Sequence, residues 1–243
     1  MRKPLFACAF LALPAIAAPG DSLLGVTLVQ GKNGASLGVP MQIVLLLTAL
    51  TMLPAILMSV TPFLRSIVVL HFLRQAIGTQ TTPSNQVLVG LALFVSLLVM
   101  QPVANEVYHK SWEPLEAGKI SASDAWDQAT QPIKTFLLKF AREKDIRLFI
   151  ELSHSAPPAK PDEVPMTALV PAYVISELKA SFQIGAVLFL PFLIIDLVVA
   201  SITLSVGMVQ LPPVMVSAPF KILLFVLVDG WNLVVGSLVK SFY

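Results

Sequence analysis

The stretch FQIGAVLFLPFLIIDLVVASITLSV, residues 182–206, decides the fold class of this chain. It holds 25 residues, and Asp196 is the only charged one among them. A helix of about 20 apolar residues crosses a hydrocarbon core about 30 Å thick. In lipid only helices and closed barrels satisfy their backbone hydrogen bonds, and this run lacks the strict alternation of a barrel strand. The stretch therefore predicts a membrane-spanning helix.

Three further apolar runs of similar length lie at residues 41–64, 86–104 and 216–239. The chain is 56% hydrophobic and only 12% charged, with a mean hydropathy of +0.82. Such a composition excludes most water-soluble enzymes. The net charge of +2 comes without a Lys/Arg cluster, so we expect no nucleic-acid partner. The predicted fold is an all-α integral membrane protein, and prolines within the runs predict kinked helices.

The N-terminal segment has the features of a secretory signal peptide. Two basic residues precede an apolar run at residues 5–13, and small residues near Ala17 stand at cleavage spacing. We interpret residues 1–17 as a signal peptide and residues 18–40 as a periplasmic segment. The alternative is an uncleaved first span, for which the apolar run is too short. Cys8, the single cysteine, lies in this peptide, so we expect no disulfide or thiolate site in the mature chain.

The signal peptide and the loop charges together predict the orientation of the chain. A periplasmic N-terminus makes residues 65–85 a cytoplasmic loop, which carries Arg65 and Arg74 and no acidic residue, as the positive-inside rule requires. Residues 105–181 then form a periplasmic segment, and residues 207–215 form an uncharged cytoplasmic turn. These features predict a multi-pass protein of the bacterial inner membrane.

The long periplasmic segment carries its own helical signals. Ser121 or Ser123 precedes Asp124 in a pattern typical of a helix N-cap. From residue 124 to residue 152, apolar side chains recur at helical spacing between charged ones. We expect amphipathic helices here, with a break at Pro132.

Patterns of catalysis and metal binding are absent from the sequence. His71, His109 and His154 are scattered, without a histidine four residues away or an acidic residue at ligand spacing. The chain has no nucleophile elbow and no Gly-rich phosphate loop. We therefore expect no enzyme activity, no metal and no cofactor.

Three charged residues within the apolar runs are the first candidates for a functional site: Asp196, Lys221 and Asp229. A charge at the bilayer centre costs about 2.5–3.5 kcal/mol on insertion scales, so it normally faces protein or water. If residues 182–206 and 216–239 form an antiparallel hairpin, Asp196 and Lys221 fall within about two turns of each other. An internal ion pair or a contact between subunits is favoured over ion transport, because no relay of further acids accompanies them.

The turn at residues 207–215 supports two interpretations. Its methionines, such as Met208, can fill irregular gaps and repack as something passes. Alternatively, Gly207 and the pair Pro212-Pro213 simply end one helix before the next. The residues themselves leave both interpretations open.

Several long stretches resemble the FliP family of flagellar biosynthesis proteins without gaps. Arg74, Glu177 and Lys179 lie within them. The resemblance covers about residues 41–241, and the matching stretches are residues 45–50, 53–57, 72–80, 83–94, 164–166, 171–179, 182–185, 191–197, 219–221 and 224–231.

The resemblance implies a non-enzymatic subunit of the flagellar export gate, in the basal body. It implies a ring of five copies that acts with FliQ, FliR and other export-apparatus membrane proteins. The expected helical oligomeric pore, raised above the bilayer plane, would pass unfolded flagellar proteins. Asp196, Lys221 and Asp229 would then organise assembly and gating.

The family also places a pore gasket at Met208, Val209, Gln210 and Leu211. Val209 and Gln210 stand where further methionines are common in the family, and Gln210 would make the constriction wetter. The equivalent injectisome subunit is the near alternative. An ion or small-solute transporter and a purely structural scaffold are the more distant ones.

Overall fold

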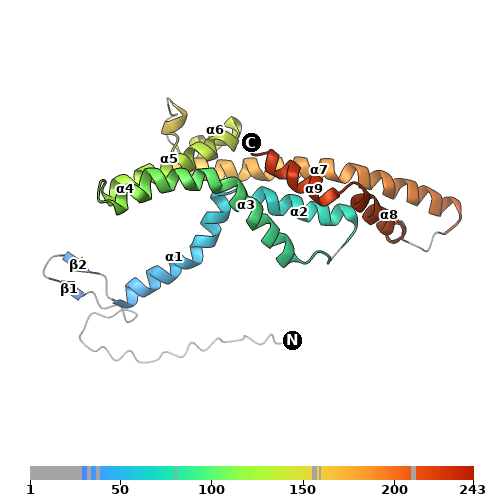
Figure 1. Ribbon diagram of the computed structural model, residues 1–243, viewed down its shortest axis with the longest axis horizontal. Coiled ribbons are helices and arrows are strands. Elements are labelled where there is room, and N and C mark those ends of the chain that lie inside the picture. Colours follow the sequence, from blue (N-terminus) through green and yellow to red (C-terminus); the bar gives the residue numbers. More distant parts are fainter. Residues whose placement is uncertain are drawn as a thin grey trace, which may run out of the picture. The chain divides into compact units, whose positions relative to one another are not determined.

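The computed structural model describes residues 29–31, 34–36, 39–79, 81–154, 158, 160–208 and 212–243 (Figure 1). The predicted signal peptide and most of the segment that follows it lie outside these residues. The chain forms two compact units, Met1–Leu53 and Pro54–Tyr243, and each is described by itself.

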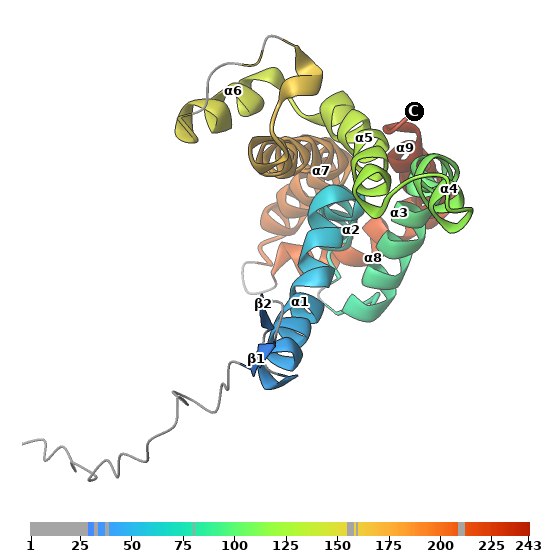
Figure 2. The same ribbon diagram turned by 90° about the vertical axis from the view of Figure 1, so that its left-hand side faces the viewer.

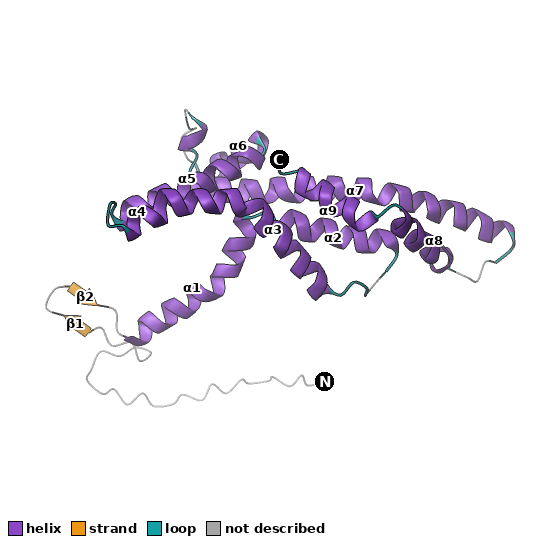
Figure 3. Ribbon diagram, in the orientation of Figure 1, coloured by secondary structure: helices purple, strands orange, loops and turns teal. Residues whose placement is uncertain are grey.

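The first unit contains a small β-hairpin and most of one apolar helix (Figure 3). Strands β1 (Val29–Gly31) and β2 (Gly34–Ser36) pair antiparallel, with Val29 opposite Ser36. Helix α1 spans Val39–Val60 and ends before Pro62, four residues short of the predicted run. Large apolar side chains along α1 are about half exposed, which suits a helix that faces lipid.

The described residues of the second unit form helices and the turns that join them, and the helical character of the predicted fold is confirmed (Figure 3). Its elements are α2 (Phe63–Ile77), α3 (Asn85–Val107), the π-helical turn η1 (Tyr108–Trp112), α4 (Glu113–Glu116), α5 (Ala122–Phe140), α6 (Glu143–Leu152), the 3-10 turn η2 (Pro161–Glu163), α7 (Met166–Ser205), α8 (Pro213–Leu227) and α9 (Gly230–Lys240). Among the described residues of both units, three helical segments are long and apolar enough to cross a membrane: Met41–Val60, Asn85–Glu116 and Met166–Ser205.

The 40-residue helix α7 is the element around which the second unit is built. Helices α2, α5, α6 and α8 all pack against it (Figure 2). The predicted span at residues 182–206 forms only its second half. Residues 166–181 continue the same helix, although their polar side chains placed them in the periplasmic segment, because those side chains contact α2 and α6 rather than water.

Residues 65–77, predicted as part of a loop, form most of α2 instead. The two arginines obscured a helical pattern in which Ser66, Val69, Leu70 and Leu73 recur at spacings of three and four and are fully buried. At Gly185 of α7 this packing is very close, because an added Cβ would lie 2.5 Å from the ring of Phe72. The Phe72 ring also makes edge contacts with Phe182 and Phe189.

Helix α5 confirms one expectation and corrects another. Ser121 caps its N-terminus and forms a capping box with Asp124, as the sequence pattern predicts. The predicted break at Pro132 is wrong, because the helix continues to Phe140. Buried side chains on both sides of Pro132 pack against the core, and this packing outweighs the one backbone hydrogen bond that proline removes. The chain turns instead at Ala141–Arg142, where both residues are extended.

The fourth apolar run, predicted as one helix at residues 216–239, is two helices. Helices α8 and α9 are bent by 65° at Val228 and Asp229. Asp229 adopts the left-handed conformation, with φ of 51°, and no α-helix continues through such a residue. The dipeptide Asp229-Gly230 is a turn signal at this break, but the prediction treated it as part of one continuous apolar run.

We predict that Gly185→Ala destabilises the second unit by about 1–3 kcal/mol, since the new methyl group must displace the Phe72 ring from a packed site. Gly90→Ala in α3 is the matched control. A Cβ there meets nothing within 4 Å, so this change should be neutral or stabilising by up to about 1 kcal/mol. Thermal unfolding of the detergent-solubilised protein measures both effects. Equal stability of the two variants would contradict the close approach.

Candidate functional site

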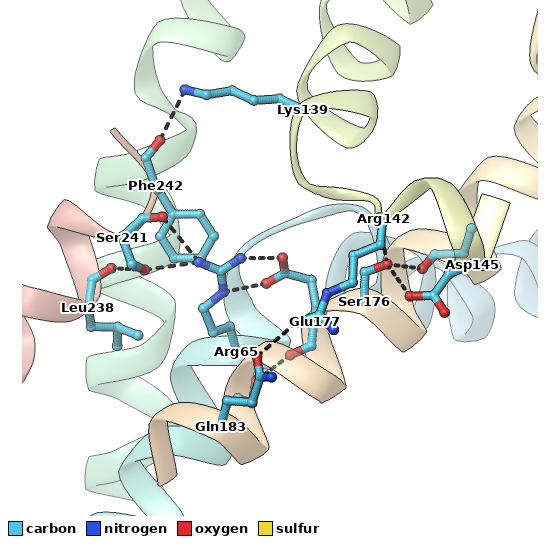
Figure 4. Close-up of polar contacts among 12 residues, drawn as sticks. Arg65, Lys139, Arg142, Asp145, Ser176, Glu177, Gln183, Leu238, Ser241 and Phe242 are labelled. Carbon is cyan, nitrogen blue, oxygen red and sulfur yellow. Dashed lines mark hydrogen bonds and ion pairs between the residues drawn. The ribbon is translucent and has the colours of Figure 1, made fainter. Parts of the chain in front are cut away.

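A buried ion pair between α2 and α7 lies at the centre of the second unit (Figure 4). Arg65 donates from Nε to Oε2 of Glu177 at 2.8 Å and from an Nη to Oε1 at 2.5 Å. The side chains are only 7% and 0% exposed. The ion pair is bidentate, with two parallel N–H···O hydrogen bonds between the guanidinium and the carboxylate. Such a pair is strong and directional.

The rest of the Arg65 guanidinium is occupied by residues that follow α9. Its other Nη donates to the Ser241 hydroxyl at 2.9 Å and to the Ser241 carbonyl at 3.3 Å. The guanidinium carbon lies 3.9 Å from the centre of the Phe242 ring and 5.5 Å from that of Phe140. The Arg65 guanidinium is thus hydrogen-bonded and enclosed on several sides. Removing either Arg65 or Glu177 would therefore leave the other as a buried, unpaired charge.

A second polar cluster begins one residue away on α7 and fixes the start of α6. The Ser176 hydroxyl donates to Asp145 at 2.8 Å and accepts from the Arg142 backbone N–H at 2.9 Å. Lys179 forms an ion pair with the other oxygen of Asp145. Burial of Asp145 opposes its charge, but the hydrogen bonds from Lys179 and Ser176 and the nearby charges hold its pKa below the usual value.

Arg65 and Asp145 were not predicted as site residues. Arg65 was interpreted as a charge of a cytoplasmic loop, and Asp145 as a solvated position on an amphipathic helix. Their partners Glu177 and Lys179 were identified through the family motif alone. A signal was present in Glu177, a lone acid among apolar residues, but its partner lies 112 positions away and no local pattern identifies it.

The structure brings Asp196 and Lys221 together between α7 and α8. Lys221 Nζ donates to Oδ2 of Asp196 at 2.6 Å, and the Ser217 hydroxyl donates to Oδ1 at 2.5 Å. The Lys221 side chain is 5% exposed and that of Asp196 is 34% exposed. Of the interpretations left open, the internal ion pair is therefore the arrangement observed within one chain.

Two other predicted residues lie apart from this pair. Asp229 is exposed at the bend before α9, where it accepts a hydrogen bond from Asn232. Arg74 donates to the Asn85 side chain at 2.7 Å and to the Pro83 carbonyl at 3.3 Å, which joins the end of α2 to the start of α3. Across the part of the chain that the structure describes, no three His, Cys, Asp or Glu side chains gather as metal ligands.

Of the four gasket residues, Met208 lies within the described residues, whereas Val209, Gln210 and Leu211 do not. Helix α7 ends in a Schellman motif, with Gly207 at φ of 80° donating to Leu204 and Met208 donating to Thr203. Gly207 thus ends the helix, in agreement with the interpretation of this segment as a helix-ending turn. The same motif fixes the backbone of Met208, whose side chain is exposed.

We predict that Arg65→Met alone destabilises the second unit by about 3–5 kcal/mol, because Glu177 is left as an unpaired buried charge. The double change Arg65→Met with Glu177→Leu should recover most of this loss. The control is Arg147→Met, which removes an exposed ion pair with Glu143 and should change little. Thermal unfolding in detergent measures all three. If the double variant is no more stable than the single one, the charge is not the cause.

The Asp145 cluster predicts a pH dependence. Its carboxyl pKa is lowered on folding, so the stabilisation is complete above the unfolded-state pKa of about 3.9 and is lost as pH falls through the folded-state pKa. Protection of α6 amides from hydrogen exchange, corrected for intrinsic rates, should be constant from about pH 7 to 5 and fall below about pH 4. Asp145→Asn should abolish this step. A step that persists in that variant would have another origin.

Comparison with known proteins confirms the family that the sequence motifs indicate. The chain matches the FliP family model over residues 46–238. It is 48% identical over 218 residues to flagellar biosynthetic protein FliP of Cereibacter sphaeroides, which covers 90% of this chain and 72% of that protein. The FliP proteins of Pectobacterium carotovorum and Bacillus subtilis strain 168 are 49% and 50% identical, over 87% and 83% of this chain and 82% and 91% of their own lengths. The chain therefore belongs to the FliP family.

Proposed function

We propose that the chain is a core subunit of the flagellar type III secretion export gate, forming with FliQ and FliR a gated channel for unfolded flagellar proteins. Membership of the FliP family carries this proposal, because it makes the chain a component of the flagellar export apparatus. The helical fold with exposed apolar helices agrees with such a role in the inner membrane and the flagellar basal body.

The exposed apolar surface supports assembly into a larger complex. Large apolar side chains that are more than half exposed occur along α3, α7 and α8. They include Phe94, Leu97, Val187, Leu190, Ile194, Leu197, Ile202, Met215, Phe220, Val226 and Leu227. Soluble monomers rarely expose contiguous apolar patches of more than a few hundred Å², so lipid or other subunits must cover this surface. A ring of five copies, together with FliQ, FliR and other export-apparatus membrane proteins, would provide that cover.

The turn after α7 is the proposed gate of this channel. The Schellman motif holds Met208 at the helix end with its side chain exposed. In a symmetric ring, the Met208 side chains of all copies would therefore lie at the same height along the pore axis. We assign the seal to Met208, Val209, Gln210 and Leu211. Gln210 makes the seal wetter than a ring of methionines alone.

We further propose that Asp196, Lys221 and Asp229 organise subunit packing and gating. The ion pair of Asp196 and Lys221 fixes α8 against α7 beside the gate turn. Exposed Asp229 remains available to a neighbouring subunit. The Asp196 carboxylate is paired with Lys221 of the same chain, as in a structural ion pair. That observation disfavours the small-solute or ion transporter.

The proposed topology keeps the predicted orientation, with a cleaved signal peptide at residues 1–17 and residues 18–40 and 105–181 on the periplasmic side. We assign residues 65–85 and 207–215 to the cytoplasmic side during insertion only. In the folded chain residues 65–77 lie beside residues 166–181, because Arg65 binds Glu177 directly, which agrees with a helical assembly raised above the bilayer plane. We favour the flagellar subunit over the equivalent injectisome subunit, since the relatives compared above are flagellar proteins.

Co-expression with FliQ and FliR, purification in mild detergent and native mass determination test the proposal. We expect a complex with five copies of this chain and both partners. A stable monomer or dimer without partners would contradict it.

The gate assignment has a separate test. Met208→Ala should increase leakage of small ions through the inner membrane while assembly persists. Met58→Ala, a change to a methionine of α1 that is equally exposed (44% against 43% for Met208), is the matched control. Equal leakage in the two variants would argue against a seal at Met208.

A further inference from the structure

Helix α9 is joined to the rest of the second unit by a sharp turn at its beginning. The bend of 65° is made at Val228 and Asp229, with Asp229 in the left-handed conformation. The Phe225 ring packs so closely against Gly230 that an added Cβ would lie 2.2 Å from it, and the same ring makes an edge contact with Trp231. The turn is thus a defined pivot between two rigid helices.

The backbones of α9 and α7 are not closely packed, although Val234 and Leu238 of α9 are buried in the core. A crevice of about 430 Å³ separates the two helices, lined on one side by Ile184 and Leu188 of α7 and on the other by Leu233 and Val234 of α9. The lining is mostly apolar. Helix α9 therefore lies over a gap in the packing, whereas α2 lies directly against α7.

The far end of α9 is held by the two residues that follow it. The Phe242 ring, 3% exposed, contacts the Arg65 guanidinium at 3.9 Å and makes an edge contact with the Phe140 ring at 5.3 Å. Lys139 donates to the Phe242 carbonyl at 3.3 Å, and Ser241 bonds to Arg65 (Figure 4). The next residue, Tyr243, is 72% exposed, so beyond the buried Val234 and Leu238 of α9 itself the attachment depends on Phe242 and its neighbour Ser241.

We propose that residues 230–243 form a hinged strap, closed by Phe242 between Arg65 and Phe140 and able to swing about Asp229. Opening the strap uncovers the crevice against α7 and admits water to the Arg65–Glu177 pair. Closure is self-reinforcing, because a dry pair attracts the aromatic face more strongly and the aromatic ring keeps the pair dry. This second conformation belongs to the single chain and does not depend on the proposed export function.

Thiol labelling of the full-length, detergent-solubilised chain tests the strap. In a Cys8→Ser background, Val234→Cys places a thiol on the 5% exposed face of α9 that closure covers, and Ala168→Cys places one at a 1% exposed position in the first turn of α7. Maleimide labelling rates are measured for both thiols in three further backgrounds. These are Phe242→Ala, the more conservative Phe242→Leu, and Tyr243→Ala as the matched control.

We expect Phe242→Ala to speed labelling of the Val234→Cys thiol at least about tenfold, with labelling of the Ala168→Cys thiol unchanged. Phe242→Leu, which keeps an apolar side chain but removes the π face, should give an intermediate rate, and Tyr243→Ala should give the parent rate. Equal labelling in the Phe242→Ala and Tyr243→Ala backgrounds would overturn the proposal. So would a parallel increase at the Ala168→Cys thiol, which would indicate general loosening rather than a swing of α9.

Discussion

The buried pair of Arg65 and Glu177 is the interaction on which the second unit depends. Moving each ion out of water costs several kcal/mol, and only close, two-pronged bonding with the remaining donors satisfied offsets that cost. Here the fork of Arg65 binds Glu177, and its remaining nitrogen reaches Ser241. The pair therefore fixes the start of α2 against the first half of α7, and the residues after α9 complete its enclosure. Sliding of α2 along α7 would leave a charge buried without its partner.

This requirement explains why α7 is polar in one half and apolar in the other. In the first half, Ser176 and Glu177 point to different neighbours, so adjacent residues fix α6 and α2 at the same level of the helix. In the second half most side chains are apolar. Gln183 at its start accepts a hydrogen bond from Arg142, and Asp196 supplies the directional contact to α8. The apolar half adheres to lipid or to protein with little preference for register, so the polar contacts decide how the helices align.

The sequence allowed prediction of those features whose cause is local. Long apolar runs specify helices by length alone, and the capping box of Ser121 and Asp124 lies within four residues. The pairing of Asp196 with Lys221 was also predictable, since a single turn connects the two helices that carry them. The role of Arg65 was not predictable, because it depends on a partner far along the chain. The bend at Asp229 was missed although Asp229-Gly230 is a turn signal, because that dipeptide lies within a long apolar run. The helix over residues 65–77 was missed because charge was taken as a sign of exposure, whereas Arg65 is charged and buried.

The two acids of α7 follow a common rule. Glu177 takes its base from α2, which precedes α7 in the chain, and Asp196 takes its base from α8, which follows it. The acids are 19 positions apart on one helix, which corresponds to about 28 Å along its axis, close to the thickness of a hydrocarbon core. Between these two fixed points the surface of α7 is largely apolar and exposed, so contacts with other molecules can form there without disturbing either pair. A subunit that must both keep its own fold and change its contacts with neighbours benefits from this separation. The two ion pairs fix the register of its own helices, whereas its contacts with neighbours are made by apolar side chains.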